Sequence, residues 1–195
     1  MGKIYYMMGK SASGKDTLFK KVREALPFLE TLTLYTTRPI REGERNGVEY
    51  FFVTDEELDA YARQGKVVEQ RLYHTACGPW RYATVDDGQI DLAASDYLVI
   101  GTLESYEKMR DFYGADCLIP LYIQVEDGER LSRALLRERA QEEPKYEEMC
   151  RRFLADTRDF SEENIRRAGI RKRFCNQNQE KCLEEIIGEI QHGKF

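Results

Sequence analysis

Apolar residues fall into two kinds of pattern that alternate along this chain. Continuous apolar runs of strand length occupy residues 4–8, 97–100 and 117–125, and such runs are typical of strands buried on both faces of a parallel sheet. Elsewhere, apolar residues recur every three or four positions, which indicates amphipathic helices. The alternation predicts a three-layer α/β fold with a parallel central sheet.

Periodic apolar residues and capping signals together predict the helices. Thr54 and Glu57 form a capping box, and Gly65 follows as a stop signal, so a helix is expected between them. From Leu183 onward, apolar residues recur at i, i+3, i+4 and i+7, which predicts a C-terminal helix. Further helices are expected from near Lys15 to Leu26 and over residues 86–94, 104–113 and 127–168, the last with a break near Pro144.

The middle of the chain has a different pattern, with short β-rich stretches separated by proline, glycine and polar residues. Asn46-Gly47 is a strong signal for a hairpin turn. Strands are expected at residues 31–35, 48–53, 67–73 and 80–85. The segment 31–85 is therefore predicted to form a small β-rich lobe beside the main sheet.

Composition narrows the class of protein. A chain of 195 residues can bury a sizeable core and fits one domain with lobes or lids. With 42% apolar and 33% charged residues, it has the composition of a soluble globular protein. Its net charge of −5 argues against general nucleic-acid binding, although it permits a local basic pocket.

The cysteines indicate a reducing compartment. They are odd in number, scattered and without C-x-x-C spacing, so we expect buried small apolar residues and no disulfide framework or zinc site. No apolar run reaches membrane-spanning length and the N-terminal run lacks a cleavage site, which together predict a cytoplasmic protein without a membrane partner. The cysteines are Cys77, Cys117, Cys150, Cys175 and Cys182.

Residues 9–15, G-K-S-A-S-G-K, follow the first strand and precede the first helix. In that context a G-x-x-x-x-G-K string predicts a phosphate-binding loop (P-loop), because its glycines let successive amides point at an anion and the helix adds its positive end. The alternative is an ordinary strand-to-helix turn. The residues expected at the donor phosphates are Gly9, Ser11, Ala12, Ser13, Gly14, Lys15, Asp16 and Thr17.

One position departs from the usual motif. The residue after the lysine is normally Ser or Thr, whose hydroxyl reaches Mg²⁺, and here it is Asp16. A carboxylate is also a suitable magnesium ligand, so we expect Asp16 to hold the metal directly or through water.

A second cationic group follows in the predicted lobe. Arg38 and Arg41 lie in a proline- and glycine-containing loop and, together with Arg45 and Tyr50, could form a clamp of planar donors for an anion. The alternative is a solvated loop whose arginines pair with Glu42 and Glu44, since exposed pairs of this kind are common and weak.

Residues 35–53 carry a family resemblance together with the phosphate loop. They read Y-T-T-R-P-I-R-E-G-E-R-N-G-V-E-Y-F-F-V. This string resembles the nucleotide-binding segment of guanylate kinases, which has T-T-R-x-x-R-x-G-E and then x-G-x-x-Y-x-F at this distance from the loop. The resemblance covers the chain in element order. It implies a P-loop NTPase fold and a purine-nucleotide kinase that uses ATP and Mg²⁺ to phosphorylate a nucleoside monophosphate, GMP to GDP.

The resemblance also implies roles for individual residues. Arg38, Arg41 and Tyr50 would bind the acceptor phosphate, and Glu69 would accept hydrogen bonds from guanine. A carboxylate suits this task because it can receive two parallel donors, although Glu69 could also be an ordinary strand residue. Three further acceptor-site residues would be Tyr82, Thr84 and Thr102.

Arginines in the region 127–168 form a third group. Arg130, Arg133 and Arg137 share one helix face. The family has an R-x-x-x-R pair in its mobile lid, matched by Arg133 and Arg137, and a later arginine, matched by Arg151 or Arg152. With Lys15, we take Arg133, Arg137 and Arg152 as the catalytic group, which would neutralise the transferring phosphoryl. The alternative is surface pairing with glutamates four residues away.

The departures from the family concern the base. Leu34 stands where the family has a base-recognising Ser, and the Y-Y-G-[ST] segment is replaced by the longer stretch 76–84. After the strand at 97–100, the family's L-D-x-D is absent and Glu104 is the first carboxylate. The sequence therefore leaves the acceptor base, the metal ligands and the oligomeric state open.

The resemblance divides the chain into a core, an acceptor-binding lobe and a helical lid. The core would comprise residues 1–30, 86–126 and 160–195, the lobe residues 31–85, and the lid about residues 130–155. Two other functions compete with a nucleotide kinase. Ribose 1,5-bisphosphate phosphokinases have G-K-D-[ST] in the loop, and guanylate-kinase-like binding modules keep the fold without catalysis.

Overall fold

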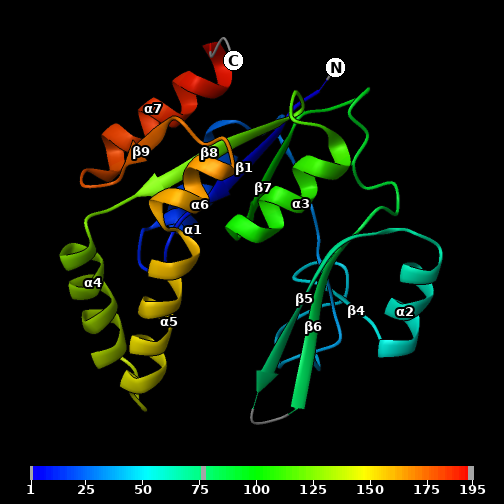
Figure 1. Cartoon of the computed structure of the whole chain (residues 1–195), viewed down its shortest axis with the longest axis horizontal. Helices are drawn as coiled ribbons and strands as arrows, with labels where there is room; N and C mark the ends of the chain where they lie inside the picture. Colours follow the sequence, from blue (N-terminus) through cyan, green and yellow to red (C-terminus); the bar gives the residue numbers. More distant parts are fainter. Residues whose placement is uncertain (1, 76–77, 193–195) are drawn as a thin grey trace.

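The computed structural model describes residues 2–75 and 78–192 and contains two β-sheets (Figure 1). The larger sheet is entirely parallel, with strand order β2-β7-β1-β8-β9. Its strands are β1 (Ile4–Met8), β2 (Glu30–Thr31), β7 (Tyr97–Gly101), β8 (Leu118–Gln124) and β9 (Arg173–Cys175). The predicted α/β fold with a parallel central sheet is confirmed.

Helices cover both faces of this sheet and make it the middle of three layers. Ile4, Tyr6 and Met8 pack with side chains of α3 and α6, whereas Tyr5 and Met7 pack with side chains of α1 and α7. This alternation along β1 is the period of two that a strand imposes. The helices are α1 (Lys15–Ala25), α3 (Leu103–Tyr113), α6 (Glu162–Arg167) and α7 (Gln179–His192).

The smaller sheet forms a lobe with its own core. Its strand order is β4-β3-β6-β5, and α2 packs on it through Leu58, which contacts Tyr35, Ala83 and Val85 in one cluster. The capping box at Thr54 is present as predicted. The elements are β3 (Tyr35–Thr36), β4 (Phe51–Phe52), α2 (Asp55–Arg63), β5 (Val67–Thr75) and β6 (Gly78–Val85).

Two helices, α4 (Asp127–Arg139) and α5 (Tyr146–Asp159), project from the main sheet on the same side as the lobe. Figure 1 shows them at the lower left, with β5, β6 and α2 at the lower right. The predicted break near Pro144 is confirmed, because Pro144 lies in the connection between α4 and α5.

The single strand predicted at residues 31–35 is wrong. The segment contributes to both sheets: Thr31 of β2 pairs with Leu98, and Tyr35 of β3 pairs with Ala83. The chain passes from one sheet to the other between them, a tertiary arrangement that the run of β-favouring residues does not reveal.

The hairpin predicted at Asn46-Gly47 is also wrong. The amide of Gly47, which has a φ of +82°, donates to the Tyr50 carbonyl, and the Asn46 side chain accepts from the Phe52 amide. β4 contains Phe51 and Phe52 alone and pairs with β3 in parallel. The hydrogen bonds of the turn are therefore local and join no two antiparallel strands. The strand that follows it, β4, pairs with the earlier strand β3.

No helix forms over residues 86–94, where one was predicted. Asp87 accepts from the Gln89 amide, and Asp91 accepts from the Ala93 amide. Such local bonds compete with helical ones, and Gly88 adopts a φ of +92°.

Cys117 and Cys182 are buried as expected, whereas Cys150 and Cys175 are exposed, and Cys77 lies outside the described residues. Within residues 2–75 and 78–192, no group of three or more metal-binding side chains is arranged around a common point. No helix in that part of the chain is long and apolar enough to cross a membrane.

Close packing at the end of β7 gives a first test. A Cβ added to Gly101 would lie 1.9 Å from the Tyr6 hydroxyl, in the core. Gly101→Ala should therefore destabilise the fold by about 1–3 kcal/mol, the usual cost of overpacking. Chemical denaturation measures this, and adding Tyr6→Phe should recover part of the loss.

Gly188→Ala is the matched control for this substitution. A Cβ added to Gly188, in α7, would meet no atom of the described residues within 4 Å, so alanine should leave stability unchanged or raise it. Equal effects of the two substitutions would contradict the packing described at Gly101.

Candidate active site

The loop between β1 and α1 follows a path that only glycine fits at Gly9 and Gly14. Gly14 caps α1 with a φ of +81°, and a Cβ there would lie 2.5 Å from the Asn176 side-chain nitrogen. A Cβ on Gly9 would lie 2.6 Å from the Ile123 carbonyl oxygen. Ala12 takes a positive φ of 62° without being glycine. This strained, close-packed path is expected of a loop that turns its amides toward an anion.

Buried side chains from distant elements hold the loop carbonyls. Asn176 donates to the Ser13 carbonyl at 2.7 Å, and Arg130 donates to the Ser11 carbonyl at 2.9 Å. Asn176 and Arg130 are almost completely buried. Both carbonyls are thus paired from outside the loop, and the amides of the first turn of α1, which lack partners within their own helix, can serve a ligand.

Arg130, which the spacing grouped with Arg133 and Arg137, is buried and anchors the phosphate loop. Its guanidinium bonds the Asp127 carboxylate at 2.7 and 3.0 Å and lies 4.6 Å from the centre of the Phe153 ring. It therefore joins α4 and α5 to the phosphate loop. The sequence offered one signal, the Asp127–Arg130 spacing of three residues on one helix.

Asp156 and Arg152 of α5 contact the same loop. The Ser11 amide donates to the Asp156 carboxylate at 2.6 Å, and Arg152 donates to the Ser11 hydroxyl at 3.3 Å. Arg152 therefore lies against the phosphate loop. Asp156 was not predicted. Its carboxylate accepts the hydrogen bond of the Ser11 amide, a donor that a phosphate oxygen could otherwise use.

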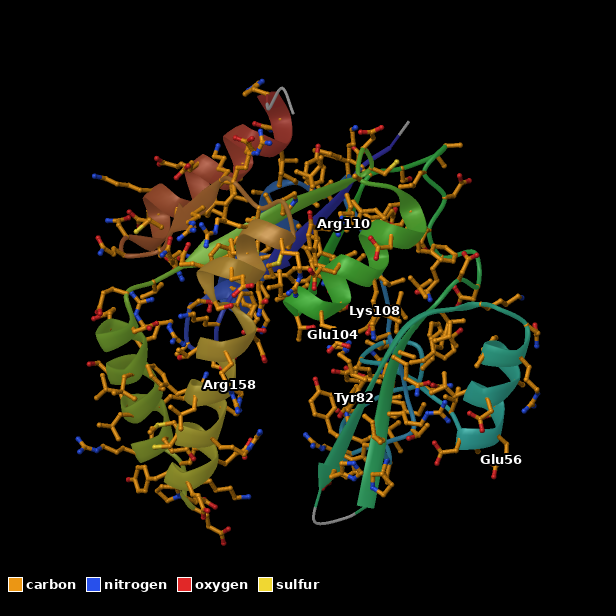
Figure 2. All side chains as sticks on the ribbon, viewed as in Figure 1. Glu56, Tyr82, Glu104, Lys108, Arg110 and Arg158 are labelled. Carbon is orange, nitrogen blue, oxygen red and sulfur yellow. The ribbon has the colours of Figure 1, made fainter. Side chains whose placement is uncertain are left out.

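A cleft of about 650 Å³ extends from the phosphate loop to the lobe. Figure 2 shows Glu104 at the end of α3 that faces the lobe, and Tyr82 on the lobe itself. The cleft brings together side chains from the loop, β5, the start of α3, and α5. Among its lining residues are Ser11, Lys15, Arg71, Tyr73, Thr102 and Arg152.

Arg38 forms a strong ion pair inside the lobe. It bonds both oxygens of Glu44 at 2.8 Å and is almost completely buried, with its guanidinium 5.3 Å from the Tyr50 ring centre. These bonds lower the pKa of the Glu44 carboxyl to about 2. The pairing alternative therefore holds for Arg38, although the residue is internal and not solvated.

The other predicted acceptor residues divide into two groups. Tyr50 and Tyr82 pack together with ring centres 5.6 Å apart, and Tyr82 is close enough to hydrogen-bond Arg38. Arg41 extends an exposed side chain, while its amide donates to Glu44 at 2.8 Å. None of Arg38, Arg41 and Tyr50 lines the 650 Å³ cleft.

Glu69 is buried, and its carboxylate is already bonded. Thr84 donates to it at 2.9 Å, and Arg71 donates through two nitrogens, each at 3.1 Å. Thr102 caps α3 by accepting from the Ser105 amide and also lines the cleft. Glu69 and Thr84, predicted separately, are thus adjacent, whereas Arg71 was missed.

The donor side holds Asp16 and Thr17 at the start of α1, both exposed. The Asp16 carboxylate lies 3.3 Å from the Lys15 ammonium. Its exposure beside the loop leaves it free to approach a bound cation.

The arginines of α4 and α5 have different environments. Arg133 pairs with Glu129 at 2.8 Å, as the surface-pairing alternative predicted. It also donates to the Asn176 carbonyl, which was not predicted. Arg137 is exposed and lines, with Arg152, a smaller cavity of about 180 Å³ between the two helices. Arg151 pairs with Glu148 and contacts the larger cleft.

Comparison with known proteins agrees with this geometry. Residues 1–85 match the family model described as guanylate kinase. The guanylate kinase of Legionella pneumophila strain Lens is 37% identical over 68 residues, which are 35% of this chain and 32% of that protein. The guanylate kinase of Neisseria gonorrhoeae is 37% identical over 99 residues, 51% of this chain and 46% of that protein. The matched stretch spans about a third to a half of the length of these relatives.

The likeness in fold extends further along the chain. The crystal structure of guanylate kinase from Anaplasma phagocytophilum superposes with a TM-score of 0.63 at 17% identity, covering 97% of this chain and 85% of that one. The first 85 residues are thus similar in sequence to guanylate kinases, and the chain as a whole shares the fold of one of them.

Proposed function

We propose that the protein transfers the γ-phosphoryl group of ATP to a nucleoside monophosphate, and that GMP is converted to GDP. One observation supports this above others: a single cleft connects the amide-lined loop to the lobe, so two phosphate-bearing substrates can meet in it. In phosphoryl transfer, positioning and electrostatic stabilisation do most of the work, and this arrangement supplies both.

The donor triphosphate would lie on the loop. Its amides and the Lys15 ammonium supply hydrogen-bond donors and positive charge for the outer phosphates. The exposed carboxylate of Asp16 at the start of α1 suits a magnesium ion bound to those phosphates. When bound, Mg²⁺ would neutralise phosphate charge.

The acceptor phosphate would lie at the lobe beside Arg38, Tyr50 and Tyr82, with Arg41 reaching over it. The Glu44 pair holds the Arg38 guanidinium in one orientation, which lowers the ordering cost on binding. Because Arg38 is internal, we infer that the lobe opens or turns as the acceptor enters.

The lid helices would then close over the reacting phosphates. Arg152 already reaches Ser11, and Arg133 and Arg137 lie on the neighbouring helix. The Asp156 carboxylate must leave the Ser11 amide when a phosphate binds there, because two anions cannot share that donor at low cost. Closure would also exclude water as a competing acceptor.

The reaction itself is tested by measuring nucleoside-diphosphate formation in a coupled assay. GMP, dGMP, AMP, CMP and UMP are compared as acceptors, with ribose 1,5-bisphosphate alongside. We expect turnover with GMP and a thermal shift with ATP alone that Lys15→Met abolishes. A binding module would ignore ATP, and a preference for ribose 1,5-bisphosphate would overturn the choice of acceptor.

Arg38→Ala should raise the KM for the nucleoside monophosphate by roughly 10- to 100-fold, since a charged hydrogen bond contributes about 1.5–3 kcal/mol. The KM for ATP should change little, because Arg38 is in the lobe and not at the loop. Steady-state kinetics with each substrate varied in turn separates the two effects.

Arg63→Ala is the control for that experiment, since Arg63 is an exposed arginine of α2 in the same lobe and lies outside the predicted clamp. It should leave both KM values near those of the unchanged protein. Equal increases in both KM values for Arg38→Ala would contradict a role at the acceptor phosphate.

Asp16→Asn should raise the Mg²⁺ concentration needed for half-maximal turnover by about tenfold or more, because the amide is a poorer ligand than the carboxylate. Titration of Mg²⁺ at fixed ATP measures this, with Glu24→Gln on the exposed face of α1 as control. An unchanged Mg²⁺ dependence would exclude Asp16 as a metal ligand.

A further inference from the structure

The side chain expected to recognise guanine is not accessible in the cleft. The Glu69 side chain has an exposed fraction of zero. Both of its oxygens accept hydrogen bonds, from Arg71 at 3.1 Å each and from Thr84 at 2.9 Å. A base entering the cleft would therefore meet Arg71 before it could reach this carboxylate.

Arg71 lies between Glu69 and the cleft. On the antiparallel ladder of β5 and β6, Glu69 is opposite Thr84 and Arg71 is opposite Tyr82, so these four residues share one face of the lobe. Arg71 lines the cleft, while Glu69 does not. The sheet thus presents a guanidinium where the sequence predicted a carboxylate.

This exchange reverses the hydrogen-bonding character of the position. A free carboxylate accepts hydrogen bonds and would select the N1–H and 2-amino donors of guanine. Arg71 uses Nε and Nη2 toward Glu69, which leaves Nη1 outside this pair. A guanidinium can offer donors alone, and its preferred partner on a purine is the O6 and N7 edge.

The pair should persist when substrate binds. Removing Arg71 from Glu69 would leave an ionised carboxylate buried with Thr84 as its remaining partner, which is strongly unfavourable. The bidentate geometry also fixes the guanidinium plane, so Arg71 is oriented before a base arrives.

We propose that Arg71, oriented by Glu69, reads the O6 and N7 acceptors of the base, and that the site takes 6-oxopurine nucleoside monophosphates without selecting for the 2-amino group. The inference rests on the proposed nucleotide-kinase function and defines the class of base that its acceptor site takes. GMP and IMP should serve alike, whereas AMP places an amino donor against Arg71 and is rejected.

The test compares kcat/KM for GMP, IMP and AMP in the unchanged protein. We expect the GMP and IMP values to agree within about threefold and the AMP value to be lower by about tenfold or more, since a two-bond contact gives discrimination of this order. The 7-deaza analogue of GMP lacks the N7 acceptor, and its KM should be higher by about tenfold.

Arg71→Met should reverse the preference by releasing the Glu69 carboxylate toward the cleft. The ratio of GMP to IMP kcat/KM should then rise by about tenfold or more in favour of GMP. Arg63→Met, at an exposed arginine of α2 on the same lobe, is the matched control and should leave the ratio unchanged.

The outcomes separate this inference from the proposed function. A GMP preference over IMP of about 100-fold or more in the unchanged protein, or full activity with 7-deaza-GMP, would overturn the role of Arg71 while leaving a guanylate kinase. An unchanged ratio in a folded Arg71→Met protein would also overturn it. Absence of turnover with every nucleoside monophosphate would instead refute the kinase function. If Arg71→Met does not fold, the role of Arg71 is decided by the kcat/KM for IMP and the KM for 7-deaza-GMP in the unchanged protein.

Discussion

The phosphate loop is held in place through its carbonyls by side chains that come from elements much further along the chain. The Ser13 amide bonds the Lys10 carbonyl within the loop, and other loop carbonyls take partners from elsewhere, which uses none of the loop's own amides. Asn176, just after β9, bonds the Ser13 carbonyl, and Arg130 from α4 bonds the Ser11 carbonyl. Two segments that come after β8 in the chain, α4 and the residue following β9, are thus bound to the loop that follows β1.

The same principle applies in the lobe, where cations are positioned by buried or half-buried carboxylates. Arg38 is held by Glu44 and Arg71 by Glu69, in both cases through two hydrogen bonds. A protein with a net charge of −5 can in this way keep oriented guanidinium groups for an anionic substrate. Each carboxylate offsets the positive charge of the arginine that it pairs with, and its two hydrogen bonds fix the orientation of the guanidinium group.

Local patterns predicted most of the fold and the loop, because these depend on periodicity and on glycine. The apolar runs became β1, β7 and β8, and the capping box at Thr54 became the start of α2. The parallel pairing of β3 with β4, the position of Asp156 and the cover of Arg71 over Glu69 depend on contacts between distant segments. Sequence spacing carries no direct signal for them. The same limit explains why spacing grouped Arg130 with Arg133 and Arg137 on one helix face without revealing that its side chain is among the most buried of the described residues.

In the function proposed above, ATP on the phosphate loop and a nucleoside monophosphate held by the lobe occupy the protein together and meet in one cleft. Calorimetric titration with a bisubstrate compound, adenosine and guanosine joined through five phosphates, tests it directly. The account predicts one equivalent bound, more tightly than ATP or GMP separately, with both nucleotides excluded from the complex, because one linked ligand avoids the cost of ordering two. Binding no tighter than that of ATP, with GMP still able to bind at the same time, would contradict it.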